Sequence, residues 1–131
     1  MGSQEKRVAK AIEEQYVGSY QIEINEIVCK ELPVNINWDT FEMDYIKFVP
    51  CVCLQRVTDA FKEVCSDHLR KETIAENINS IEIYCIANEG AEDKKELKIA
   101  DGVFSLTACW GGHHSGYFSD LVIREFLENN L

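Results

Sequence analysis

Hydrophobic residues recur along this chain with two spacings, one typical of helices and one typical of strands. In residues 3–17 they lie four apart, at Val8, Ile12 and Tyr16, which places them on one face of a helix. Gly18 follows directly and is a common helix terminator. The pattern therefore predicts a helix over residues 3–17 that stops at Gly18.

The next segment, residues 19–31, fits both spacings. Tyr20, Ile22 and Ile24 alternate as the residues of a strand do. In a helix, Ile24 would instead share one face with Ile27 and Val28. Both interpretations remain open from the pattern alone. We favour a helix because Pro33 follows the segment as a terminator.

Strict alternation of hydrophobic and polar residues predicts strands in the rest of the chain. Two of these strands flank Asp101-Gly102, a favoured hairpin turn because glycine adopts positive φ at little cost. The predicted strands are Leu32–Trp38, Ile81–Ala87, Leu97–Ala100 and Val103–Trp110.

Three further segments carry a helical stripe of hydrophobic residues. The first runs from Pro50 to about Cys65, and the second from a Ser66 or Asp67 cap through Ile78. The third begins after Ser119, which suits an N-cap. Residues 39–48 are predicted to form a loop or irregular helical turn, and residues 89–96 a charged loop.

These elements predict one α+β domain over residues 1–131, because no linker rich in Gly, Pro or Ser divides the chain. Helices packed on one face of a mostly antiparallel sheet of about four strands would bury every hydrophobic stripe. Phe61 and Leu106 lie on faces that we expect to be buried. Aromatic residues at such positions, including Trp38 and Trp110, are assigned to the core.

Charge narrows the choice of partners. The chain carries 23 acidic and 13 basic residues, a formal net charge of −10. Such a surface repels phosphate backbones and anionic lipid, so we expect no direct binding to nucleic acid and no membrane association. Residues 13–46 contain eight acidic residues against a single lysine, Lys30.

This acidic segment has two interpretations. It is either a solvated face that aids solubility, or a docking face that accelerates association with a basic protein. In the second case Glu23, Glu26, Glu42 and Asp44 are the candidate binding residues. Whether they form one patch depends on the fold. A compact acidic protein that masks a basic surface would act as an inhibitor or immunity-type protein.

The six cysteines favour a reduced, cytoplasmic protein. The chain is longer than disulfide-dense small domains, and its polar first residues lack the apolar stretch of a secretory signal. Cys53, Cys85 and Cys109 lie in hydrophobic runs, where a free cysteine behaves as a small buried hydrophobic residue.

An alternative function centres on the loop from Cys109 to Asp120. Cys109, His113 and His114 are residue types that assist nucleophilic attack, and both histidines with Asp120 can ligate a metal. No standard metal-site spacing is met, however. The sequence therefore favours a plain loop, and a binding protein over a metal-dependent or thiol enzyme.

We expect no cofactor. A homo-oligomeric scaffold without a ligand is the third hypothesis, since the sequence does not specify an oligomeric state.

Overall fold

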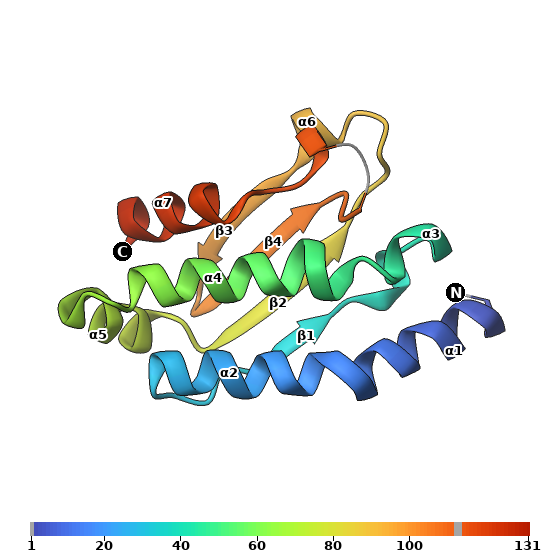
Figure 1. Cartoon of the computed structure of the whole chain (residues 1–131). Helices are drawn as coiled ribbons and strands as arrows, with labels where there is room; N and C mark the ends of the chain where they lie inside the picture. Colours follow the sequence, from blue (N-terminus) through green and yellow to red (C-terminus); the bar gives the residue numbers. More distant parts are fainter. Residues whose placement is uncertain (1, 112–113) are drawn as a thin grey trace.

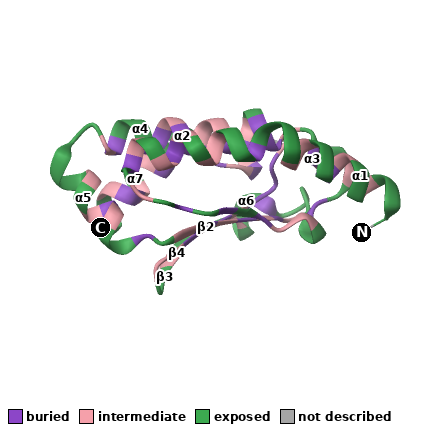
Figure 2. Ribbon diagram, turned by 90° about the horizontal axis from the view of Figure 1, so that it is seen from below, coloured by how far each residue is buried: buried purple, intermediate pink, exposed green. Residues whose placement is uncertain are grey.

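The computed structural model describes residues 2–111 and 114–131. It has two layers, a four-stranded sheet and a layer of helices that covers one face of it (Figures 1 and 2). The sheet order is β1-β2-β4-β3. The strands are β1 (Val34–Ile36), β2 (Ser80–Cys85), β3 (Glu96–Ala100) and β4 (Val103–Ala108).

The sheet is mixed and mostly parallel, so the prediction of a mostly antiparallel sheet is wrong. Strand β2 runs parallel to both β1 and β4, and only the hairpin pair β3–β4 is antiparallel. The connection from β1 to β2 contains two full helices, and such a crossover is what parallel neighbours need. Alternation within a strand encodes which face is buried, not the direction of the neighbouring strand. The α+β class and the four strands are confirmed.

Residues 3–28 form one long helix. It comprises α1 (Ser3–Ile12), a π-helical segment (Glu13–Val17) and α2 (Gly18–Val28). The predicted stop at Gly18 is wrong, since Gly18 has helical angles, φ −59° and ψ −41°. Burial of Val17 and Ile24 on either side offsets the low helix propensity of glycine.

Of the two interpretations of residues 19–31, the helix is correct. This helix continues to Val28 and is terminated by Cys29, which has a left-handed φ of 60°. Among the helices that the structure describes, none combines the length and the apolar character needed to cross a membrane.

The other predicted helices are confirmed. A π-helical segment (Val49–Leu54) leads into α4 (Gln55–Val64), and the Asp67 carboxylate caps α5 (His68–Asn77) by accepting hydrogen bonds from two backbone N–H groups. The Ser119 hydroxyl caps α7 (Asp120–Asn130). The short helices α3 (Met43–Ile46) and α6 (Ala91–Lys94) lie within the two segments predicted as loops.

The core fills the space between the two layers. Phe61 of α4 and Leu106 of β4 are fully buried, as predicted. Phe104 stacks its ring on Phe126 of α7 at 5.9 Å and lies 6.2 Å from the Phe61 ring. The side chains on the opposite face of β2 and β4 are only partly buried, and most are polar. This explains why the long helices that the structure describes lie on the other face (Figure 2).

Helix α2 also closes one edge of the sheet. The backbone N–H of Val34 donates to Gln21 Oε1, and that of Leu32 donates to Asn25 Oδ1, each at 2.8 Å. These side-chain amides take hydrogen bonds that a further strand would otherwise make. The opposite edge, β3, pairs only with β4 among the described residues.

Candidate functional site

The four predicted acidic residues fall into two pairs. Glu23 and Glu26 lie on α2, whereas Glu42 and Asp44 lie at α3, toward the opposite end of the helical layer (Figure 1). Glu23 forms an ion pair with Lys62 of α4 at 2.8 Å. The other three are exposed and make no ion pair with the described residues. The fold therefore does not gather all four residues into one patch.

Glu23 lines a groove on the helical layer, which we name the α2–α4 groove. It has a volume of ≈ 270 Å³ and is lined by hydroxyl, amide and carboxylate groups. The Tyr20 hydroxyl donates to Gln55 Oε1, and Gln55 Nε2 donates to Asp59 Oδ1, both at 2.9 Å. The lining residues are Gln15, Tyr16, Ser19, Tyr20, Glu23 and Gln55.

Acidic groups act on Tyr20 in this groove, while the Lys62 ammonium pairs with Glu23 beside it. Partial burial, followed by the nearby Glu23 carboxylate, raises the pKa of Tyr20 above its usual value. Tyr20 therefore stays neutral near pH 7, and its hydroxyl hydrogen remains available to hold the Gln55 amide in place. Fixed oxygen atoms beside a carboxylate are well suited to accept hydrogen bonds from a lysine or arginine side chain.

Both π-helical segments lie beside the groove and contact each other. Tyr16 belongs to the segment Glu13–Val17, and Gln55 directly follows the segment Val49–Leu54. A π turn adds a residue to a helix and changes the direction of the side chains that follow, and it is frequent at functional sites. Sequence spacing gives no signal for either π turn.

The predicted loop site is only partly described. Cys109 is fully buried and hydrogen-bonds the Tyr45 side chain, whereas Asp120 is exposed at the first position of α7. His113 and the side chain of His114 lie outside the described residues. Within the part that is described, no three side chains of metal-ligating type lie close enough together to hold an ion.

The described part of this loop is fastened to the body of the protein. The backbone N–H of Cys109 donates to Gly116 O at 2.8 Å. Lys95 Nζ donates to Ser115 O at 2.9 Å and to Tyr117 O at 3.5 Å. Lys95, which precedes β3, therefore holds the described part of the loop in place.

All six cysteines are free thiols in the structure. Cys53, Cys85 and Cys109 are buried, as predicted, and Cys29 and Cys51 are exposed. Burial raises the pKa of Cys85 to about 11 and that of Cys53 well above its usual value. These thiols therefore stay protonated near neutral pH, which suits core packing.

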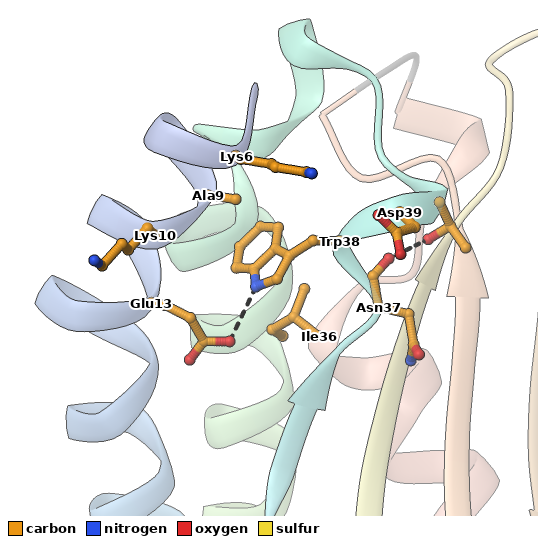
Figure 3. Close-up of a pocket in the computed structure, with 9 residues that line it drawn as sticks. Lys6, Ala9, Lys10, Glu13, Ile36, Asn37, Trp38 and Asp39 are labelled. Atoms are coloured by element: carbon orange, nitrogen blue, oxygen red, sulfur yellow. Dashed lines mark hydrogen bonds between the residues drawn. The ribbon is translucent and has the colours of Figure 1, made fainter. Parts of the chain in front are cut away.

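A larger pocket lies beside Trp38, which sequence reasoning assigned to the core. It has a volume of ≈ 570 Å³ and separates α1 from the 3-10 turn Trp38–Thr40 that follows β1 (Figure 3). Trp38 is half-buried and forms one wall, and its indole Nε1–H donates to Glu13 Oε1 at 3.0 Å. We name this hollow the Trp38 pocket.

The turn that carries Trp38 is held by hydrogen bonds. Thr40 Oγ1 donates to Asn37 O at 2.6 Å and accepts from the backbone N–H of Cys85 at 2.9 Å. The turn lies at the carboxyl end of β1, the end of parallel strands where ligands commonly bind. Sequence reasoning assigned Trp38 to the end of a strand and missed this pocket. The one local signal for the pocket is the set of polar residues around Trp38, namely Asn37, Asp39 and Thr40. This signal becomes informative only once the direction of β1 is known.

No protein-family model, curated protein or solved structure matches this chain. Its function is therefore inferred from its own residues.

Proposed function

We propose that this protein binds another protein that carries a basic surface, and that the partner docks on the α2–α4 groove. The observation that carries the proposal is the grouping of Tyr16, Tyr20 and Glu23 with the amide of Gln55 around one hollow. The net charge of −10 supports it, because opposite charge accelerates the encounter of two proteins. An inhibitor or immunity-type role in the cytoplasm follows naturally for such a compact acidic domain.

The groove suits an arginine or lysine side chain of the partner. Tyr16 is 36% exposed, and tyrosine rings frequently form the strongest contacts in protein interfaces. A cation gains from contact with the face of such a ring and from the Glu23 carboxylate beside it. The hydrogen-bonded chain from Tyr20 through Gln55 to Asp59 fixes the acceptors before the partner arrives, which reduces the entropic cost of binding.

Glu42 and Asp44 have a different role in this proposal. They are exposed and lie toward the opposite end of the helical layer, so they attract a basic protein at long range without entering the groove. Rim charges of this kind mainly change the association rate. The enzymatic alternative uses the Cys109–Asp120 loop, in which His113 and the side chain of His114 lie outside the described residues.

The test is a capture experiment with three forms of the protein as bait. The three baits are the wild type, E23K/E26K and E42K/D44K, each immobilised and exposed to native lysate at low salt. The captured proteins are then eluted by raising the salt concentration to about 0.5 M, where charges are strongly screened. We expect basic proteins that elute as salt rises, about tenfold less of them on E23K/E26K, and a two- to threefold slower association with E42K/D44K.

The two double variants are matched controls, because both change the net charge equally. Circular dichroism of each variant confirms that the helices are retained. Capture that is insensitive to salt, or equal losses in both double variants, would contradict docking on the groove.

A further inference from the structure

We propose that the Trp38 pocket binds a small zwitterion with a planar side chain, an aromatic α-amino acid being the simplest member of that class. This site lies apart from the α2–α4 groove and does not depend on the proposed protein partner. Its volume of ≈ 570 Å³ lies in the range of small-molecule sites, roughly 300–1,000 Å³.

The first argument is the fixed indole. The hydrogen bond from Trp38 Nε1 to Glu13 Oε1 holds the ring between α1 and β1, as Figure 3 shows. The ring of Phe41 lies 5.5 Å from the Trp38 ring. A half-buried indole that is held in this way offers a surface on which a planar group stacks, and aromatic pairs contribute about 0.5–1.5 kcal/mol beyond the area that they bury.

The second argument is the placement of charge. Lys6 of α1 and Asp39 of the turn both line the pocket, from opposite walls. In the part of the chain that the structure describes, neither residue has an ion-pair partner within 4.0 Å. Lys6 extends toward the turn in Figure 3, whereas Lys10 extends away from the indole.

Four charged residues line the pocket: Lys10 pairs with Glu14, and Glu13 accepts the hydrogen bond of the Trp38 indole. The opposite charges of Lys6 and Asp39 are left to favour a ligand that carries both charges. A ligand carboxylate would contact Lys6 Nζ, and a ligand ammonium group would contact the Asp39 carboxylate. A simple anion would bring its charge near Asp39, and a simple cation would bring its charge near Lys6. Charge complementarity therefore favours the zwitterion over either one.

The experiment uses the two indole N–H signals as separate reporters. In a ¹H–¹⁵N NMR titration of the whole protein with L-phenylalanine, we expect the Trp38 indole signal to shift. The signal of Trp110, which is fully buried, should stay in place. The variant Trp38→Phe assigns the two signals. Phenylacetate and phenethylamine, each with one of the two charges, should bind at least tenfold more weakly than L-phenylalanine.

Three variants test the residues. Lys6→Gln and Asp39→Asn should each weaken L-phenylalanine binding about tenfold, while Lys10→Gln removes the same charge as Lys6→Gln and should change binding less than twofold. Equal binding of phenylacetate would make this an anion site, and equal binding of phenethylamine would make it a site for a partner's basic side chain. Either result, or an unshifted Trp38 signal, overturns the proposal.

Discussion

Two turns follow parallel strands at the same end of the sheet, and each carries a tryptophan. After β1, Trp38 is half-buried beside an open pocket and donates to a glutamate side chain. After β4, Trp110 is fully buried and donates to the backbone oxygen of Tyr84 at 2.9 Å. The ring of Phe118, which precedes α7, lies 6.4 Å from the Trp110 ring.

The comparison separates a closed turn from an open one. In the sequence, the glycine- and histidine-rich segment after β4 resembled a site more than the short segment after β1 did. In the described residues, the segment after β4 is held down by Lys95, and the segment after β1 lines the larger pocket. Glycines beside chemically active residue types can thus mark close packing instead of ligand access.

The largest expected effect comes from removing each tryptophan in turn. Trp110→Ala should lower the free energy of unfolding by about 3–5 kcal/mol, because it empties a fully buried position. Trp38→Ala should lower it by about 1–2 kcal/mol, since the ring is only half-buried. Urea unfolding followed by far-ultraviolet circular dichroism measures both values. Similar losses in the two variants would show that the turns do not differ as described.

A smaller effect is expected from a methyl group at Gly111. This residue has φ +93°, and an added Cβ would collide with the ring of Phe48. Gly111→Ala should therefore cost about 2–3 kcal/mol. Gly18→Ala is the matched control, because Gly18 is helical and has open space around it, so alanine should stabilise the protein by about 0.5–1 kcal/mol. The same urea measurement tests both, and a neutral Gly111→Ala would argue against tight packing of the turn on Phe48.

Loosening the loop after β4 should have a more modest effect. Lys95→Met removes two hydrogen bonds to loop carbonyls and the contact of Nζ with the Phe118 ring at 5.1 Å. We expect a loss of about 1 kcal/mol and faster amide hydrogen exchange in residues 115–117. Lys94→Met, at an exposed neighbour, should change stability by less than about 0.5 kcal/mol. Unchanged exchange rates in Lys95→Met would mean that other contacts hold the loop.

The smallest effect near neutral pH concerns Cys85, at the end of β2 between the two turns. Its pKa is raised from 9.0 to about 11 by burial, so its contribution to stability is full below pH 9 and decreases as the pH rises toward 11. The stability difference between the wild type and Cys85→Ala should therefore shift by about 1 kcal/mol against the wild type from pH 8 to pH 10. Thermal unfolding at several pH values measures this shift. A constant difference would place the thiol in contact with solvent.

Much of the fold could be predicted because hydrophobic and polar residues alternate along each strand, which shows which face is buried. The hairpin turn at Asp101-Gly102 and the cap at Ser119 follow from short-range chemistry, as do the buried faces of β2 and β4. The direction of β1 relative to β2 could not be predicted from alternation, because the same pattern serves both pairings. The continuous helix through Gly18 was missed because its stability depends on burial of Val17 and Ile24 by distant elements.

The candidate sites depend on contacts between distant segments. Glu23 was identified from local charge density, but its neighbours Gln55 and Asp59 come from a helix that lies beside it only in the fold. Likewise, the Trp38 pocket joins Lys6 to Asp39, which are 33 positions apart in the sequence. Chemistry assembled across such separations has no local pattern.

The edge of the sheet that Gln21 and Asn25 cover limits how folded copies could assemble. With the backbone N–H groups of Leu32 and Val34 occupied by side-chain amides at the β1 edge, β3 is the edge more open to pairing in the described structure. Two copies joined through β3 in antiparallel fashion would each present outward only the β1 edge, where these two donors are already satisfied. Edge pairing of the native protein would therefore favour a closed dimer over a fibre.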